Sequence, residues 1–391
     1  MAIPAAFPYI TVDIVPPPAP AAQRAPGVIA VVGKTPNGAN GGTQPANKPI
    51  VVETLSDIAN YFAKVNPDGS VAATDLYNSL VLAMQQTPRP SKMYGVRVSG
   101  DDYAAALSSI EGIDDITFVS LANEKAVGVA ATNTGLNALK NHVESVSAQG
   151  LRRIGVAMVD PARVKSNTYV ADTLTEVTTA PNSLKSDVGR MIMVAARGAS
   201  QDVATAAMAA IAGYEPQVSV VLKGINGIQV PRGSEYSPSE IMGLAQEGII
   251  PIIDPSLMVG DSLHFGDGRT FTGNATWAYV DFVRVIDDIE FRLKAGLIGA
   301  IGDARITKEG MTSLKIRLEG ILGPLQRRAV IDDFLVDIPV LTILSMPESA
   351  RTTTDSAILV TARQDRNVEV VVTVKYGPAV HRLGVKLVVK F

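Results

Sequence analysis

The sequence contains no cysteine and only three histidines, and these shortages exclude several kinds of chemistry. Without cysteine the chain has no disulfide, no thiol nucleophile and no cysteine-ligated metal. His142, His264 and His381 lie far apart, and none stands in a metal-ligand spacing such as His-Glu-x-x-His. The Gly-x-Ser-x-Gly motif of a hydrolase nucleophile is also missing. We therefore expect no catalytic residue, no cofactor and no metal site, and we predict that the protein is not an enzyme.

Charge is scarce as well. Charged residues make up 19% of the chain and the formal net charge is -3, which gives no electrostatic reason to expect nucleic acid as a partner. The acidic pairs, such as Asp101-Asp102 and Asp287-Asp288, are adjacent residues. Because adjacent side chains diverge on a helix or a strand, no such pair forms a carboxylate dyad.

Long hydrophobic runs do not occur, since Gly, Pro or a charge interrupts each of them. We therefore expect no membrane insertion. Residues 1–9 lack the basic and apolar regions of a secretory signal, so we expect a protein that is made and kept in a cytoplasm.

One stretch invites a nucleotide-binding interpretation. Gly33-Lys34-Thr35 follows an apolar run, as in a phosphate-binding loop. That loop requires a glycine five positions before Gly33, where this chain has Val28, and Pro36 interrupts the helix that should follow. We interpret the stretch as an ordinary exit from a strand into a loop.

The sequence does contain a regular alternation of short apolar runs and helical patterns between residues 27 and 255. The apolar runs predict strands at 28–32, 50–52, 92–98, 116–121, 153–159, 191–195, 218–222 and 249–253. Helices are predicted at 54–63, 74–86, 135–147 and 202–212. The alternation is typical of a layered α/β body with a partly parallel sheet.

Residues 256–366 have a different pattern, which predicts a C-terminal α+β unit. Two long helices are expected at 277–297 and 307–333, the second kinked or broken at Pro324. A hairpin or long turn is expected at 257–271, and strands at 340–344 and 357–361. The second helix carries a set of basic residues that could face an acidic partner, although the pattern alone favours an ordinary solvated helix face. They are Lys308, Lys315, Arg317, Arg327 and Arg328.

The two ends of the chain predict extended arms that act as connectors. Residues 1–26 form an N-terminal linker arm in this interpretation, because prolines between Val15 and Pro26 favour an extended backbone; a disordered terminus is the alternative. Residues 367–391 form a C-terminal strand arm. An apolar terminal strand either completes the protein's own sheet or is added to the sheet of a neighbour. The arm residues expected at inter-subunit contacts are Tyr9, Ile10, Val12, Ile14, Val370, Val372, Val374, Val385, Leu387 and Val389.

The order of these segments resembles that of contractile tail sheath proteins. The resemblance rests on the loop 33–38, the phrase 47–57 (Asn-Lys-Pro-Ile-Val-Val-Glu-Thr-Leu-Ser-Asp), and the strands 93–98 and 112–120. It continues in Gly266-Asp267-Gly268-Arg269-Thr270, in the Tyr-Val phrase of 277–285 and in the closing strands. Val285 stands where the family has a second arginine, and the chain is short for the family, which implies a minimal sheath.

The resemblance implies a structural subunit that polymerises helically around an inner tail tube and contracts without hydrolysing nucleotide. Its partners would be other copies of itself through the arms, the inner tube protein, and the baseplate and tail-terminator proteins. It would assemble in the host cytoplasm and reside in a phage tail, a tailocin or a related injection particle. The basic helix around Lys315 would face the tube. An α/β enzyme with an unrecognised ligand site, or a non-contractile coat protein that assembles by strand exchange, remain the alternatives.

Overall fold

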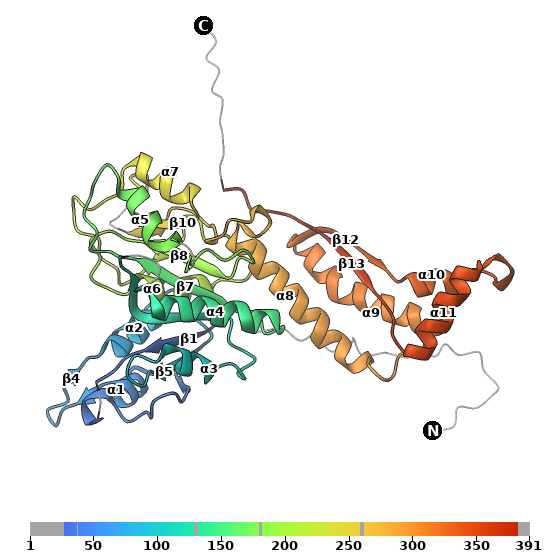
Figure 1. Cartoon of the computed structure of the whole chain (residues 1–391), viewed down its shortest axis with the longest axis horizontal. Coiled ribbons are helices and arrows are strands. Elements are labelled where there is room, and N and C mark those ends of the chain that lie inside the picture. Colours follow the sequence, from blue (N-terminus) through green and yellow to red (C-terminus); the bar gives the residue numbers. More distant parts are fainter. Residues whose placement is uncertain (1–26, 37, 129–131, 180–181, 259–261, 382–391) are drawn as a thin grey trace, which may run out of the picture. The chain divides into compact units, whose positions relative to one another are not determined.

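The computed structural model describes residues 27–36, 38–128, 132–179, 182–258 and 262–381 (Figure 1). These residues form two compact units, each with more contacts within itself than with the other. The larger unit holds 27–290, 324–335 and 372–381, and the smaller holds 291–323 and 336–371. The predicted arm residues Tyr9, Ile10, Val12, Ile14, Val385, Leu387 and Val389 lie outside the described residues.

A sheet of nine strands forms the centre of the larger unit. Its order is β2-β5-β1-β6-β7-β8-β10-β11-β9. The strands are β1 (Val28–Gly33), β2 (Ile50–Val52), β5 (Lys92–Arg97), β6 (Phe118–Ala126), β7 (Ile154–Val159), β8 (Met191–Ala195), β9 (Gly224–Ile225), β10 (Ile249–Ile253) and β11 (Leu263–Phe265). The six strands from β5 to β10 in this order are parallel, whereas β2, β11 and β9 pair antiparallel at the margins. The expected α/β body with a partly parallel sheet is confirmed.

Helices cover both faces of this sheet. The side chains of β1 show why, because successive residues point into two different apolar clusters. Ile29 and Val31 enter one apolar cluster, while Val28, Ala30 and Val32 enter the other. Because successive side chains of a strand point to opposite faces, a strand buried on both faces has a continuous apolar sequence. The helices of this unit are α1 (Leu55–Phe62), α2 (Asp75–Met84), α3 (Tyr103–Ser108), α4 (Thr134–Ala148), α5 (Tyr169–Thr178), α6 (Val203–Gly213) and α7 (Pro238–Gln246).

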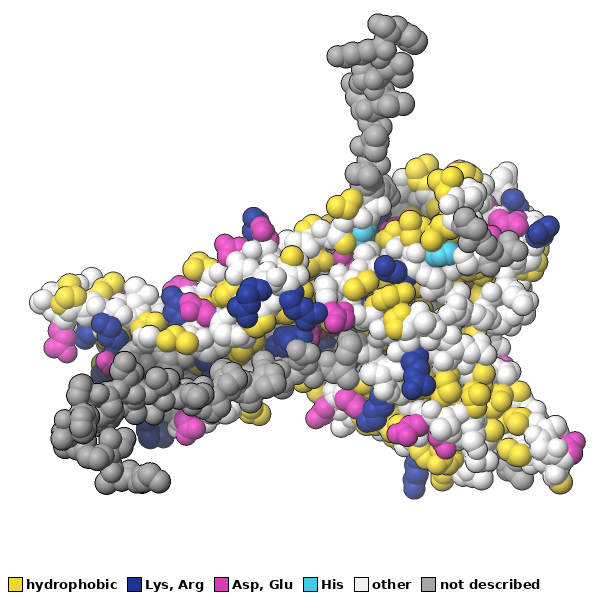
Figure 2. Space-filling view, turned by 180° about the vertical axis from the view of Figure 1, so that it is seen from behind, with side chains coloured by type: hydrophobic (Ala, Val, Ile, Leu, Met, Phe, Trp, Pro, Cys, Tyr) yellow, Lys and Arg dark blue, Asp and Glu magenta, His cyan; other side chains and the backbone are white. Residues whose placement is uncertain are grey.

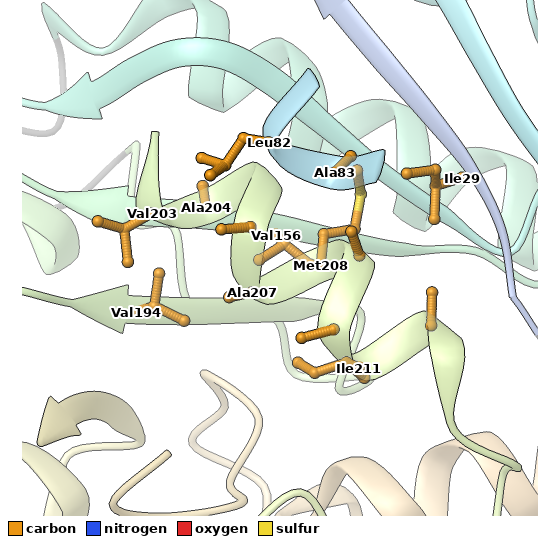
Figure 3. Close-up of a cluster of buried hydrophobic side chains, with 14 of the residues drawn as sticks. Ile29, Leu82, Ala83, Val156, Val194, Val203, Ala204, Ala207, Met208 and Ile211 are labelled. Carbon is orange, nitrogen blue, oxygen red and sulfur yellow. The ribbon is translucent and has the colours of Figure 1, made fainter. Parts of the chain in front are cut away.

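Helix α6 is the most deeply buried of these helices, and its small side chains allow a close approach to the sheet. All residues from Val203 to Ala212 are buried. Figure 3 shows Met208 and its neighbours on α6 lying over Val156 and Val194 of the sheet, beside Leu82 of α2. Asp202 caps the helix by accepting a 3.0 Å hydrogen bond from the Thr205 amide.

Gly33, the glycine of the apparent phosphate loop, has a packing role in the structure. A Cβ at this position would lie 2.5 Å from the Cβ of Ala122 on β6. Lys34 forms ion pairs with Asp101 at 2.7 Å and with Glu124 at 3.3 Å. The stretch is therefore an exit from a strand into a loop, as the sequence predicts, and the ion pairs of Lys34 are an additional finding.

A buried arginine fixes the segment that precedes α7. The guanidinium of Arg197 lies between the rings of Tyr169 and Tyr236, with centroid distances of 4.6 and 4.7 Å. It donates to Glu240 at 2.6 Å and to the backbone oxygens of Ser234 and Glu235. The hydrogen bonds from Arg197 hold the pKa of Glu240 at about 2, well below its usual value of 4.5.

The C-terminal part of the chain is more helical than the sequence predicts. It contains α8 (Val280–Leu297), α9 (Lys308–Arg327), α10 (Pro339–Ser345) and α11 (Thr353–Asp365), with α8 beginning in the larger unit and ending in the smaller. In the smaller unit α8 and α9 pack closely, because Gly296 leaves room for Ile321. Short 3-10 turns occupy Gly38–Gly41, Ala275–Trp277, Ile298–Ala300 and Glu348–Ala350.

Two further sheets are ribbons of two strands. One pairs β3 (Lys64–Val65) with β4 (Val71–Ala72). The other pairs β12 (Ile331–Asp337) with β13 (Val371–Tyr376), and we call it the β12–β13 ribbon. Lys375 at the end of β13 forms an ion pair with Asp332 at the start of β12, as expected of antiparallel strands.

Four predicted elements are wrong, each for a local reason. Residues 340–344 form helix α10, which Pro339 begins at its first turn. Residues 357–361 belong to α11, which starts with a capping box between Thr352 and Asp355. The helix predicted to reach residue 333 ends at Arg327, because Ala329 takes a left-handed conformation with φ of 55° and the chain continues as β12. Residues 218–222 are turns rather than a strand.

Candidate assembly interface

The candidate interface begins with the predicted arm strand, which the structure places in the β12–β13 ribbon. Val372 and Val374 lie in β13 and Val370 precedes it; all three are half-buried and share one face with Tyr376. Val371 and the alternate residues after it are exposed on the other face. This strand pairs within its own chain along one edge, while its other edge meets no described strand.

The ribbon offers the longest exposed strand edges among the described residues. At the margins of the large sheet, β2 has three residues and β9 has two. In the ribbon, β12 has seven residues and β13 has six. Short marginal strands discourage pairing with another chain, whereas a long unpaired edge is a template for it. Among the described strands, the ribbon is therefore the candidate site for strand addition, which stays a prediction.

The end of β13 is anchored within the larger unit. The hydroxyl of Tyr376 donates a 2.8 Å hydrogen bond to Asp281 in the first turn of α8. Its ring packs edge-on against Phe282 with a centroid distance of 5.3 Å. Burial and the neighbouring Asp281 carboxylate raise the pKa of the Tyr376 hydroxyl, so the group stays protonated and remains a donor.

The last described residue is anchored too. The Nε2 atom of His381 lies 2.8 Å from the Ser219 hydroxyl, and its ring packs edge-on against Tyr279 at 5.1 Å. The segment from Tyr376 to His381 borders a cavity of about 320 Å³. Its other walls are Asp267, Arg269, Tyr279 and Asp281. His381 is therefore held in place by two contacts within the larger unit.

Charged groups hold the first turns of α8 in place within the larger unit. Arg190 donates two hydrogen bonds to Asp287, at 2.6 and 2.9 Å, and both side chains are buried. Arg152 donates to Glu290 at 2.6 Å. Arg284 is fully buried and donates to the backbone oxygen of Tyr214; desolvation lowers the pKa of its guanidinium to about 10. Paired buried charges fix the direction of a helix more strictly than apolar contacts, which tolerate sliding.

The five basic residues predicted to face a tube do not lie on one face of α9. At about 100° per residue, Lys308 and Lys315 share a face, whereas Arg317 points to the opposite side. Arg328 lies beyond the helix and forms an ion pair with Glu215. Arg327 is exposed at the last turn. The structure therefore brings together only Lys308 and Lys315, and their contact with a tube stays a prediction.

The enzyme alternative directs attention to the carboxyl ends of the parallel strands, where open α/β sheets bind ligands. A cavity of about 280 Å³ lies there, bordered by Ser79, Asn123 and Asp202 among others. Asp202 accepts from the Ser79 hydroxyl at 2.6 Å and from the Asn123 amide at 2.9 Å, so its carboxylate is used in holding α2, β6 and α6 together. Over the described ranges there is no cluster of His, Asp and Glu that could hold a metal ion.

The charge distribution on one face and the length of the apolar helices bear on lipid and nucleic-acid partners. Basic and acidic side chains are interspersed on the face seen in Figure 2. None of the helices within the described part of the chain is long and apolar enough to cross a membrane.

The fold consists of an α/β unit, a mainly helical unit and a two-stranded ribbon with long unpaired edges. Comparison with solved structures shows which known proteins share this fold. The chain has the fold of contractile sheath subunits. No protein-family model matches the sequence, and no curated protein matches it either.

Three solved structures illustrate the similarity. The sheath complex of an extracellular contractile injection system, PVC, in the contracted state has a TM-score of 0.68 at 12% identity, covering 99% of this chain and 98% of that one. The contracted helical sheath of the anti-feeding prophage has a TM-score of 0.62 at 14% identity, covering 99% of both chains. The sheath tail protein of Desulfitobacterium hafniense has a TM-score of 0.57 at 11% identity, covering 85% of this chain and 93% of that one. The resemblance inferred from sequence is thus confirmed at the level of the fold.

Proposed function

We propose that this chain is the sheath subunit of a contractile injection machine. One observation carries the proposal: the fold matches contracted sheath subunits over nearly the whole of both chains. The subunit would polymerise around an inner tube, with baseplate and tail-terminator proteins at the two ends.

In this function the arms hold neighbouring subunits together while the bodies move. Backbone hydrogen bonds of an added strand supply affinity, and its alternating side chains set the register. A head-to-tail contact that does not close on itself generates an open helical filament, as a sheath requires. Contraction is then a rigid-body rearrangement of the bodies from a metastable extended lattice, and it consumes no nucleotide.

Anchoring of the C-terminal segment supports this mechanism. Tyr376 and His381 attach the start of the segment to the larger unit, so a pull on residues 382–391 reaches α8 through Asp281 and Tyr279. The paired charges of α8, above all Arg190 with Asp287, pass that load to the sheet. The particle would be built in the host cytoplasm and would reside in a tail or injection apparatus.

Negative-stain electron microscopy of the purified, overexpressed protein tests the proposal. Hollow tubes or stacked rings are expected, because sheath subunits without a tube collapse into the contracted lattice. A small oligomer of uniform size that does not polymerise at any concentration or salt would contradict it and favour the enzyme alternative. A coat protein that assembles without a tube would form the same polymers but would not co-assemble with a tube protein.

A further inference from the structure

Asp267 and Arg269, in the Gly-Asp-Gly-Arg-Thr stretch of the sequence, line the cavity of about 320 Å³ beside the C-terminal segment. A volume of this size is typical of a small-molecule site. All of its walls belong to the larger unit. The stretch is held in shape by Gly268, whose amide donates to Asp267 Oδ1 at 2.7 Å and whose carbonyl oxygen accepts from the Val280 amide at 3.0 Å.

One carboxylate oxygen in this cavity has an unused acceptor. Asp267 is 8% exposed, and its Oδ2 atom is buried but accepts no hydrogen bond from any residue that the structure describes. The Nε atom of Arg269 lies 3.6 Å from it, which suits an ion pair but is too long for a hydrogen bond. Buried carboxylate oxygens normally accept hydrogen bonds, because otherwise nothing offsets the loss of their hydration.

Arg269 is held by other groups and does not turn towards Asp267. Its Nη1 atom donates to the backbone oxygen of Ala245 at 3.1 Å. Its guanidinium lies over the ring of Tyr279, 5.8 Å from the centroid, and the backbones of the two residues form an antiparallel bridge. The acceptor of Asp267 Oδ2 therefore stays open to a group that enters the cavity.

The other lining groups favour a cation. Asp281, a second carboxylate, is 3% exposed and borders the cavity, so the lining holds two carboxylates and one guanidinium. Tyr279 and Tyr376 also line it, and the faces of aromatic rings attract cations. Among the described residues the carboxylates belong to no group of His, Asp and Glu that could hold a metal ion. An organic cation with N–H donors matches this combination of an open acceptor, negative charge and aromatic rings.

We propose that this cavity binds a guanidinium or primary ammonium group, which donates a hydrogen bond to Asp267 Oδ2 while its charge lies near Asp281 and the ring of Tyr279. A free amine and the side chain of an arginine or lysine share this chemistry. The site goes beyond the proposed sheath function and does not depend on it. Because Tyr376 and His381 form part of the lining, the bound group joins the C-terminal segment to the stretch that holds Asp267.

Binding of small cations to the full-length protein tests the proposal. Methylguanidinium and methylammonium are titrated at constant ionic strength, and binding is measured by ligand-detected NMR. Tetramethylammonium is the matched control, because it has the same charge but no N–H donor. The two donors should bind at least about tenfold more tightly than the control, since only they can form the charge-assisted hydrogen bond. Equal affinity for all three cations would overturn the proposal.

Substitutions locate the site. Asp267→Asn keeps the oxygen that accepts from Gly268 but replaces Oδ2 with a donor, so the affinity for methylguanidinium should fall at least about tenfold. Asp187→Asn, at an exposed position outside the cavity, should bind as the parent protein does. Tyr279→Leu should weaken binding about threefold or more, whereas Tyr279→Phe keeps the ring and should not. Urea denaturation shows that each variant is folded. Parent-like binding by Asp267→Asn would overturn the proposal.

A comparison of protein states then identifies the source of the bound group. Equal binding by dispersed and polymerised protein assigns the site to a free amine, and loss of binding on polymerisation assigns it to a side chain of another copy. Tighter binding by Arg382→Gln than by the parent assigns it to the chain's own Arg382, which follows His381. Absence of saturable binding below about 10 mM by both dispersed proteins would overturn this inference alone. A chain that binds methylguanidinium but never polymerises refutes the sheath function and supports the site.

Discussion

The hydroxyl of Tyr376 donates a 2.8 Å hydrogen bond to the carboxylate of Asp281, although the two residues are 95 positions apart. This bond joins the end of the ribbon strand β13 to the first turn of α8. Asp281 is only 3% exposed, so loss of the donor leaves a buried carboxylate with one fewer hydrogen bond. The relationship fixes where the C-terminal segment leaves the folded chain.

Tyr376→Phe should therefore destabilise the protein while keeping the packing of the ring on Phe282. A lost hydrogen bond to a buried charged group costs about 1.5–3 kcal/mol. Urea denaturation measures the change. Tyr279→Phe is the matched control, because its ring contact with His381 persists and the residue is 38% exposed. If the two variants are equally stable, the hydrogen bond to Asp281 does not contribute to the free energy of unfolding.

The ion pair of Arg190 with Asp287 leads to a second prediction. Arg190→Met leaves the Asp287 carboxylate buried without its guanidinium, and removal of one partner from a buried pair costs about 3–5 kcal/mol. Arg190→Met/Asp287→Leu removes both charges and should recover most of that loss. Chemical denaturation of the two variants and the parent protein measures the difference. If the double variant is no more stable than the single one, the packing of the aliphatic stem, rather than charge, explains the effect.

His142 should make the stability of the protein depend on pH in the mildly acidic range. Burial, and then the charge of Arg153, lower the pKa of His142 to about 4 from 6.5. The neutral ring faces Arg153 Nη1 at 3.0 Å and accepts from it. Because the folded state binds its proton less readily than the unfolded state, stability is full above pH 6.5 and declines as the pH falls to about 4, by about 3 kcal/mol. Thermal unfolding across this range should show the slope, and His142→Gln should flatten it.

Glu240 should make the stability of the protein depend on pH in a more acidic range than His142 does. Its folded pKa of about 2, lowered from 4.5, means that its contribution is complete above pH 4.5 and disappears as the pH falls towards 2. The size is on the order of 3 kcal/mol. Denaturant titrations at several pH values should show a steeper loss in the parent protein than in Glu240→Gln. Glu53→Gln, an exposed position, should keep the parent slope. Parallel curves for all three proteins would contradict the assigned role of the Arg197 pair.

The layered body could be predicted from sequence because its signals are local. Val28 to Val32 is apolar throughout, which is what a strand covered on both faces requires, and Thr54 and Asp202 stand where helices begin. The ribbon could not be predicted in the same way. Asp332-Asp333 interrupts the alternation of β12, so the sequence pattern there continues the preceding helix instead of indicating a strand. Apolar runs of about five residues, such as 340–344, fit a helix as well as a strand.

The contacts that anchor the C-terminal segment could not be predicted from the sequence either. Tyr376 and Asp281, like His381 and Ser219, are far apart in the chain, and neither pair has a spacing that indicates contact. The arm itself is inferred from β-branched residues, which report strand formation but not the partner strand. Its outer part, with Val385, Leu387 and Val389, stays a prediction.

Two truncations separate the anchor from the arm. A chain that ends at His381 keeps Tyr376 on Asp281 and the His381 ring on Tyr279, so its stability should stay within about 0.5 kcal/mol of the parent protein. It should nevertheless fail to form tubes, because residues 382–391 would supply the strand added to a neighbour. A chain that ends at Lys375 loses both anchors and should be less stable by several kcal/mol. Thermal unfolding and electron microscopy of the two truncated proteins provide the comparison. If the chain that ends at His381 still forms tubes, the C-terminal arm is not needed for the contact between subunits. The N-terminal arm would then have to make that contact without it.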